Sequence, residues 1–153
     1  MKSIFRNQKG FTLIEILLVV AAIAILAGIV IVAINPAKQL GDTSNAKRNA
    51  DVLTISNAVN QYTIGNSGSL PASITSSSTE ICNTAIASSS VCATAGLIDL
   101  SVLTANQTYL AAIPVETGAV GNGAGYMISK SVNGRTTVEA QHESQGAVIS
   151  VTR

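Results

Sequence analysis

The sequence predicts an α+β protein: a long hydrophobic N-terminal α-helix, kinked near Pro36, whose C-terminal half packs on a small antiparallel β-sheet. Three observations predict this fold. The chain of 153 residues begins with a long apolar run, helical spacing returns after a polar stretch, and short β-branched runs fill the last third. This length suits one domain with an appendage, because domains usually hold about 100–200 residues.

The composition excludes two broad classes of protein. Charged residues make up 11% of the chain and apolar residues 47%, which is the reverse of what a disordered chain requires. The formal net charge of +1 disfavours a strongly basic nucleic-acid binder. A membrane-associated chain, or a domain with a neutral surface, remains.

The apolar run from Phe11 to Ile34 favours the membrane. As a helix it extends about 36 Å, and the hydrocarbon core of a bilayer measures about 30 Å. Its Leu, Ile, Val and Phe side chains contribute about −5 to −10 kcal/mol to insertion, whereas a central carboxylate costs about +2.5 to +3.5 kcal/mol. We therefore expect residues 11–34 to form a transmembrane helix despite the charge of Glu15.

Residues 1–10 form a short basic leader with Lys2, Arg6 and Lys9 and no acidic residue. By the positive-inside rule they hold the N-terminus in the cytoplasm, which predicts a precursor that crosses the inner (cytoplasmic) membrane once. A Sec signal peptide that is cut off behind its apolar region is the alternative. The run is longer than a signal's core of about 7–15 residues, and no convincing cleavage site follows it.

Glu15 is the charged residue inside the apolar run. It either reaches to the interface or is protonated, or it pairs with a cation at the same depth. The run itself holds no Lys, Arg or His. Removal of the leader after Gly10 would create an α-amino group on Phe11, one helical turn from Glu15. A neighbouring copy, shifted lengthwise, would place its amine against this carboxylate.

The seven residues from Lys9 to Glu15, KGFTLIE, resemble the class III signal of type IV prepilins and type II secretion pseudopilins. The resemblance implies that a prepilin peptidase cleaves between Gly10 and Phe11 and that Phe11 is then N-methylated. It also implies that Glu15 neutralises the α-amine of an adjacent subunit during assembly. The implied partners are copies of the chain in a helical filament, membrane lipid before assembly, the prepilin peptidase/methylase, and the pilus or type II secretion assembly machinery.

Residues 35–65 are predicted to form an amphipathic helix that continues into the head. Pro36 removes a backbone donor and disfavours helix at Asn35, so a kink or local break is expected there. An apolar stripe at helical spacing follows, formed by Ala46, Ala50, Val52, Leu53, Ile55, Val59 and Tyr62. Lys47, Arg48 and Asp51 are expected on the opposite, solvated face.

Residues 66–108 are predicted to be a Ser/Thr-rich loop between the helix and the sheet. This segment contains Cys82 and Cys92, the two cysteines of the chain. An even count in a translocated domain indicates a disulfide, with two free buried thiols as the alternative.

Residues 109–153 are predicted to form an antiparallel meander of three or four strands. The candidate strands are Tyr109–Val115, Gly125–Ser131, Arg135–Gln141 and Ala147–Thr152. Asn133-Gly134 indicates a two-residue type I′ hairpin turn. The glycines between 118 and 125 are expected in a flexible loop, because no helix follows them to bind a phosphate.

The sequence favours a structural function over catalysis. It shows no catalytic set, no cofactor motif and no metal-ligand cluster, and its only histidine, His142, falls in a predicted turn. We expect a subunit of a type IV pilus-like filament, extracellular or periplasmic when mature. The alternatives are a type II secretion pseudopilin or a minor or competence pilin involved in DNA uptake. No nucleic acid is expected as a partner, because the six basic residues beyond the apolar run form no stripe against seven acidic ones.

Overall fold

The computed structural model describes residues 10–153, so the predicted leader lies outside the described residues except for Gly10. The chain divides into two compact units, one ending at Gln39 and one, the head, spanning Leu40–Arg153. The secondary structure consists of α1 (Leu13–Ile34), α2 (Pro36–Gly65), β1 (Thr79–Cys82), α3 (Ser89–Thr94), α4 (Ser101–Thr104), a 3-10 turn (Ala105–Gln107), β2 (Gly123–Lys130), β3 (Thr136–Ala140) and β4 (Ser150–Thr152). The α+β fold class is confirmed.

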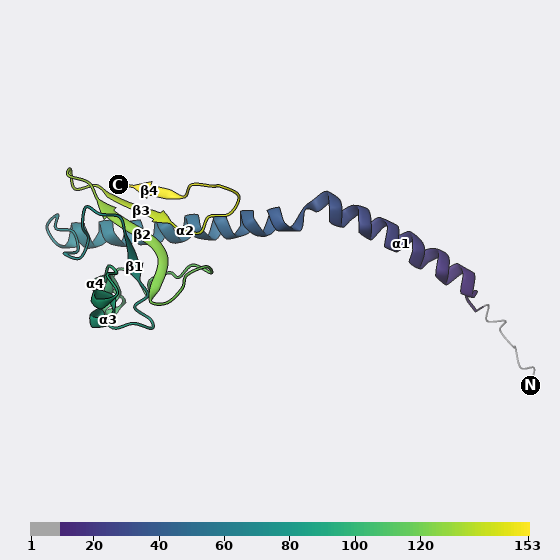
Figure 1. The fold of residues 1–153 in the computed structure, drawn as a ribbon, viewed down its shortest axis with the longest axis horizontal. Coiled ribbons are helices and arrows are strands. Elements are labelled where there is room, and N and C mark those ends of the chain that lie inside the picture. The colour runs from purple at the N-terminus through teal and green to yellow at the C-terminus, as the bar shows by residue number, and fades with distance from the viewer. Residues whose placement is uncertain (1–9) are drawn as a thin grey trace, which may run out of the picture. The chain divides into compact units, whose positions relative to one another are not determined.

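The head is a four-stranded antiparallel sheet packed on α2 (Figure 1), in the order β1-β2-β3-β4. Alternate residues of β3 are buried, as expected of a strand with one face on the core. The core contains side chains from α2, the sheet and the connecting segments, among them Val52, Ile55, Val59, Ile74, Leu100, Leu103, Tyr126, Ile128 and Val138.

Two predictions about strands are wrong. Tyr109–Val115 forms no strand; this segment is irregular, and its Ile113 is buried in the core instead. The fourth strand is β1, which lies within the segment predicted to be a Ser/Thr-rich loop. β1 forms because β2 pairs along one side of it, while Ile98 forms a parallel bridge to Ile81 on the other.

The hairpin between β2 and β3 also differs from the prediction. The ladder ends at the pair Lys130 and Thr136, and the N–H of Ser131 then donates to the carbonyl of Arg135 at 2.8 Å. Gly134 has a φ of +79° and donates to the carbonyl of Ser131 at 3.0 Å, whereas Asn133 has no positive φ. A type I′ turn needs positive φ at both central residues, so this is a three-residue loop with a left-handed glycine.

Candidate functional site

The helix α1 begins immediately after the predicted processing site. Thr12 is its N-cap, with an extended backbone at φ −81° and ψ 150°, and the Thr12 hydroxyl accepts the N–H of Glu15 at 3.3 Å. Gly10, Phe11 and Thr12 therefore precede the helix, and all three are exposed. The bond between Gly10 and Phe11 lies in an accessible, non-helical segment, which is the kind of backbone that proteases reach most easily.

Glu15 lies in the first turn of α1 and is exposed. The pattern Thr12-Leu-Ile-Glu15 is that of a capping box, in which the residue three positions after the cap is acidic. A carboxylate at this position also interacts favourably with the partial positive charge of a helix N-terminus. Thr12 was not predicted as a functional residue, although the spacing from Thr12 to Glu15 carried the signal.

Apart from Glu15 in its first turn, α1 has an apolar surface on every side. None of its 22 residues is buried, and the side chains of Leu13 and Val32 are 80% and 83% exposed. This helix is long and apolar enough to span a membrane, by length and composition. A helix that is hydrophobic on every side requires lipid or other protein around it, because water would leave that whole surface unfavourably hydrated.

A helix break separates α1 from α2 at Asn35, where the sequence predicted one. Asn35 adopts a left-handed backbone, with φ 45° and ψ 77°, and forms the C-cap of α1. Its side-chain oxygen accepts the N–H of Lys38 at 3.3 Å, and its carbonyl accepts the same N–H at 3.0 Å. Asn35 thus ends one helix and caps the next, and Pro36 occupies the first helical position, where its missing N–H costs nothing.

A buried polar cluster ties α2 to two loops of the head. Arg48 Nε donates to Glu116 Oε1, and the side chains are 9% and 2% exposed. Glu116 Oε2 lies 2.8 Å from His142 Nδ1. Arg48 Nη1 also donates to the side-chain oxygen of Asn45 at 3.0 Å, and Asn45 Nδ2 donates to the carbonyl of Ser144 at 2.9 Å.

This cluster corrects the prediction that Arg48 lies on a solvated face, since the residue is 7% exposed and ion-paired. Lys47 does lie at the surface, with a side chain that is 53% exposed, whereas the side chain of Asp51 is 18% exposed. Asp51 accepts a hydrogen bond of 2.6 Å from the hydroxyl of Tyr126. Burial, together with this contact to Asp51, raises the pKa of Tyr126, so the phenol stays protonated and remains a donor.

The glycine-rich segment has a packing function within the same cluster. Gly123 and Gly125 lie in β2 rather than in a flexible loop. Gly125 has a φ of +80°, and a Cβ atom at this position would lie 2.7 Å from Cβ of Glu116. A side chain at residue 125 would therefore be strained and would displace the buried carboxylate.

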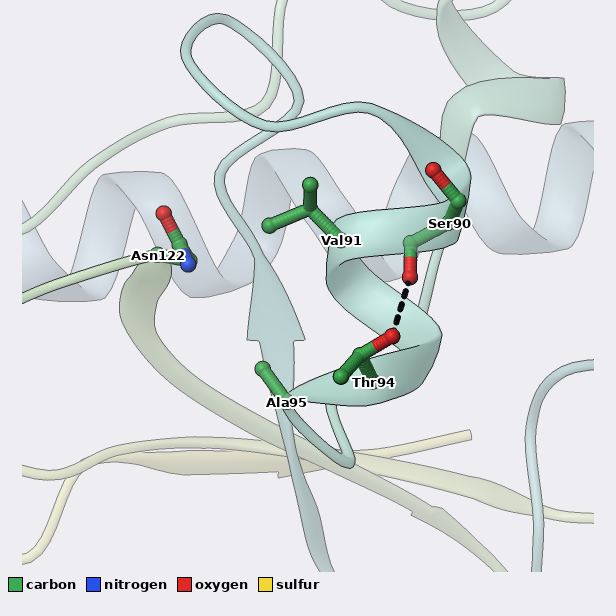
Figure 2. Close-up of a pocket in the computed structure, with 5 residues that line it drawn as sticks. All are labelled: Ser90, Val91, Thr94, Ala95 and Asn122. Carbon is green, nitrogen blue, oxygen red and sulfur yellow. Dashed lines mark hydrogen bonds between the residues drawn. The ribbon is translucent and has the colours of Figure 1, made fainter.

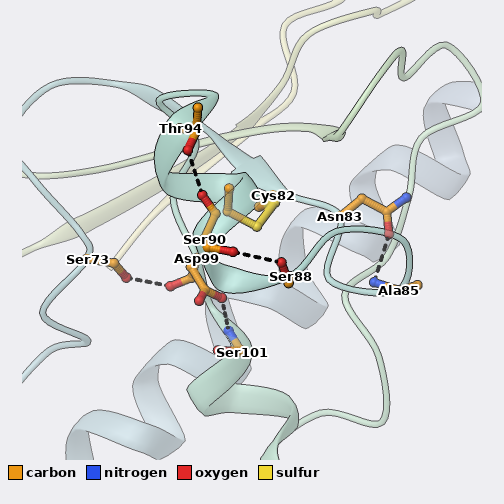
Figure 3. The surroundings of a disulfide bond; sticks show 10 residues. Ser73, Cys82, Asn83, Ala85, Ser88, Ser90, Thr94, Asp99 and Ser101 are labelled. Atoms are coloured by element: carbon orange, nitrogen blue, oxygen red, sulfur yellow. Dashed lines mark hydrogen bonds between the residues drawn. A yellow bond between two sulfur atoms is a disulfide. The ribbon is translucent and has the colours of Figure 1, made fainter.

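Cys82 and Cys92 form a disulfide, as predicted, which joins the end of β1 to α3 (Figure 3). Both cysteines are fully buried, and their Cα atoms lie 5.7 Å apart. Nearby, the N–H of Ser101 donates to the Asp99 carboxylate at 2.8 Å. Burial opposes ionisation of Asp99, but hydrogen bonds from Ser89 and Ser101 outweigh it and lower the pKa of this carboxyl group.

A shallow pocket of about 320 Å³ lies beside α3 (Figure 2). It is lined by Ser90, Val91, Thr94, Ala95 and Asn122. The Thr94 hydroxyl donates to the carbonyl of Ser90 at 2.9 Å, so it is already occupied within α3. Since these five side chains are uncharged, the pocket offers no ion pair to a ligand.

A comparison with protein-family models identifies the N-terminal region. Residues 5–31 carry the prokaryotic N-terminal methylation motif. This motif is the class III signal of type IV pilins and pseudopilins, and in this chain it includes Gly10, Phe11 and Glu15. The methylation motif thus covers the predicted processing site, the cap of α1 and most of the apolar helix. No match was found among curated proteins or among solved structures.

Proposed function

We propose that this chain is the precursor of a structural subunit of a type IV pilus-like filament. In this proposal a prepilin peptidase cleaves after Gly10, Phe11 becomes N-methylated, and the mature subunits polymerise through α1. The methylation motif at residues 5–31 is the observation that carries the proposal.

The exposure of α1 supports polymerisation as the fate of this helix. A helix with no buried residue and an apolar surface on every side is stable in lipid before assembly. Contact with α1 helices of other copies would replace lipid in a filament core. The head contributes a core of its own, which leaves α1 available for these contacts.

Glu15 gives the proposed assembly its register. Cleavage creates a positively charged amine at Phe11, and Glu15 follows four residues later, in the first turn of α1. A carboxylate in an apolar helix gains little stability from a distant charge, but it strongly favours the one arrangement in which a neighbour's amine reaches it. We infer that the amine of one subunit pairs with Glu15 of the next.

The disulfide supports the proposed orientation. Disulfides persist in oxidising compartments, and the Cys82–Cys92 bridge lies in the head. The basic residues Lys2, Arg6 and Lys9 would remain in the cytoplasm by the positive-inside rule. The precursor would then cross the inner membrane once, with the head outside the cytoplasm.

The processing step is tested by the mass of the N-terminal peptide from the native protein. The peptide is expected to begin at Phe11 and to carry one added methyl group. A protein that begins at Met1, or behind Ile34, would contradict the proposed processing.

The assembly step is tested by Glu15→Val, with Glu15→Asp and Ile14→Val as matched controls. Glu15→Val is expected to insert in the membrane and to be processed, but to form few or no filaments in a shear-and-pellet assay. The controls retain the charge or leave it untouched, so they should assemble. Normal filaments from Glu15→Val would refute the role of the carboxylate.

A pseudopilin is the second candidate, because the methylation motif occurs in both classes. The two candidates differ in the length and abundance of the filament. Long surface fibres composed of this chain support the pilus, whereas a short periplasmic filament that is required for protein secretion supports the pseudopilin.

A further inference from the structure

The chain contains two Asn-Gly steps, Asn122-Gly123 and Asn133-Gly134, and folding places them in contrasting surroundings. Asn133-Gly134 lies in the loop between β2 and β3, where residues 131–135 are all exposed. Asn122-Gly123 lies at the start of β2, where Asn122 is half-buried and Gly123 is buried. An Asn-Gly step is chemically distinctive, because glycine has no Cβ atom to shield its backbone nitrogen from the preceding side chain.

The Asn133-Gly134 step is only weakly restrained. Within residues 10–153, the structure shows no hydrogen bond to the side-chain amide of Asn133. A Cβ atom at Gly134 would meet no other atom within 4 Å, so the space around this backbone is open. The backbone nitrogen of Gly134 donates to the carbonyl of Ser131 at 3.0 Å. Breaking one neutral hydrogen bond of this kind slows a reaction at that nitrogen by only about 2- to 13-fold.

The peptide between Asn122 and Gly123 is held on both sides. Its carbonyl accepts the N–H of Asn83 at 2.8 Å, and its N–H donates to the carbonyl of Val120 at 3.4 Å. Gly123 also belongs to the ladder between β1 and β2. A Cβ atom at Gly123 would clash with the Glu80 carboxylate, so the surroundings leave little room for rearrangement. A reaction at this step would have to open the end of β2.

We propose that Asn133 is a site of spontaneous covalent modification, at which the folded head converts an asparagine into aspartate and isoaspartate. The backbone nitrogen of Gly134 attacks Cγ of Asn133, so that a new C–N bond forms and the bond from Cγ to Nδ2 breaks. The proton of the attacking nitrogen passes through water to Nδ2, which leaves as ammonia. A succinimide ring results, and no oxidant, reductant or enzyme takes part.

Water then opens the succinimide ring in one of two ways. Addition to the side-chain carbonyl carbon gives aspartate with the ordinary backbone. Addition to the main-chain carbonyl carbon gives isoaspartate, whose backbone runs through Cγ and is one methylene longer. Either product carries a carboxylate that is ionised at neutral pH, since an aspartate has an ordinary pKa of about 3.9. The hairpin therefore gains a negative charge two positions before Arg135.

The modification has a consequence for the surface of the head. Because ammonia is lost, the reaction is irreversible, and the fraction of chains that carry the new charge rises with the time since synthesis. In a filament of the proposed kind, older subunits would differ from newer ones in the charge of this hairpin. That consequence rests on the proposed function, whereas the modification itself requires neither a membrane nor a filament.

The test uses the whole mature chain, beginning at Phe11, in micelles of an uncharged detergent. Incubation in H₂¹⁸O at neutral and at mildly alkaline pH marks each carboxylate that forms during the incubation. Trypsin releases residues 131–135 and chymotrypsin releases residues 111–126, and each of these peptides contains a single asparagine. Mass spectrometry therefore reports Asn133 and Asn122 separately, and labelling by a protein isoaspartate methyltransferase measures the isoaspartate.

Asn133 should react at least about fivefold faster than Asn122 in the folded head, because the second peptide has one more backbone hydrogen bond to break. In guanidinium chloride the two rates should become similar, since unfolding removes the restraints on both. The rate at Asn133 should rise with pH, because the attacking nitrogen must lose its proton. Asn122→Gln is the matched control, since it removes the other amide and should leave the rate at residue 133 unchanged.

Two variants test the chemistry of the loop. Gly134→Ala should slow the reaction, because a Cβ atom shields the attacking nitrogen. Alanine is strained at a φ of +79°, so Asn133→Gln is the second variant. Its longer side chain has to close a larger ring, and the hairpin should stay unmodified while the backbone is kept.

Two outcomes would overturn the proposal: equal rates at Asn133 and Asn122 in the folded head, or an Asn133 that stays intact while the unfolded chain reacts. An Asn133→Gln variant whose hairpin gains a carboxylate as fast as the wild type would also overturn it. The assay needs no peptidase and no filament, so its result is independent of the proposed function.

Discussion

Replacement of Glu116 by Gln removes the negative charge that faces Arg48 inside the head. The Glu116 side chain is 2% exposed and contacts both Arg48 and His142. In the variant, Arg48 keeps its hydrogen bonds to Asn45 and Ser144 but has no counter-charge. A buried cation without a partner is strongly unfavourable, because little water reaches it.

The expected loss of stability follows from this burial. Breaking a buried ion pair by removing one partner costs about 3–5 kcal/mol. The head would lose a large part of its stability, because domains are stable by only about 5–15 kcal/mol. With a urea m-value of about 2 kcal/mol/M, the unfolding midpoint should fall by roughly 1.5–2.5 M.

Urea unfolding of the detergent-bound protein, followed by tyrosine fluorescence, measures this loss. The three tyrosines, Tyr62, Tyr109 and Tyr126, all lie in the head, and the chain has no tryptophan, so the signal reports the head alone. Lys47→Gln is the matched control, since it breaks an exposed ion pair one residue from Arg48 and should cost about 0–1 kcal/mol.

A loss below about 1 kcal/mol in Glu116→Gln would refute the reasoning, because it would place the pair in a solvated site. A double variant, Arg48→Met with Glu116→Leu, tests the same reasoning from the other side. It removes both charges, so it should recover much of the loss, as buried pairs replaced by apolar residues often do. A double variant that is as unstable as the single one would show that packing, and not charge, causes the loss.

Two further predictions concern the α3 region. The double variant Cys82→Ser with Cys92→Ser should lower the stability of the head by about 2.5–3 kcal/mol, because the disulfide closes a ring across a sequence separation of 10. Equal urea midpoints for the oxidised wild type and this variant would contradict the prediction. Asp99 has a lowered pKa in the folded head, so its ionised form stabilises the head above pH 4 and this contribution is lost as the pH falls through the folded-state pKa. Asp99→Asn should therefore flatten the acid limb of a plot of stability against pH between about pH 5 and 2, and an unchanged limb would show that other groups determine it.

The N-terminal half of the fold could be predicted from sequence because its signals are local. The apolar run is continuous along the chain, and the Thr12-to-Glu15 spacing and the Asn35-Pro36 pair each lie within about one helical turn. The helix α1 and the break at Asn35 therefore occur close to where the pattern placed them. The cap at Thr12 was not predicted, although the Thr12-to-Glu15 spacing is that of a capping box.

The errors in the sheet arise from contacts between distant residues. β1 is only four residues long and lies in a Ser/Thr-rich segment, and it becomes a strand because β2 and Ile98 pair with its two sides. Tyr109–Val115 has the composition of a strand, but Pro114 lacks the N–H that a ladder requires, and the segment fills the core through Ile113. Periodicity within a segment cannot report either of these contacts.

The charged residues of the head show the same dependence on distance. Arg48, in α2, is buried because Glu116, which lies 68 positions later in the chain, pairs with it from the loop before β2. Lys130 and Arg153, 23 positions apart in the chain, both pair with Thr136, one on each side of β3. Helical spacing alone predicted that Arg48 lies at the surface. The positions of the basic residues along the chain do not show which of them pair across the sheet.

The double role of Asn35 has a mechanical consequence for a fibre built from such subunits. Because Asn35 caps α2, the N–H groups of Lys38 and Gln39 in its first turn donate to Asn35 and not to carbonyls of α1. Tension along the fibre axis would reach the head through a single linker residue instead of through a continuous rod. Rotation about the backbone of Asn35 could then absorb bending or extension while the folded heads, with their cores and disulfides, stay intact.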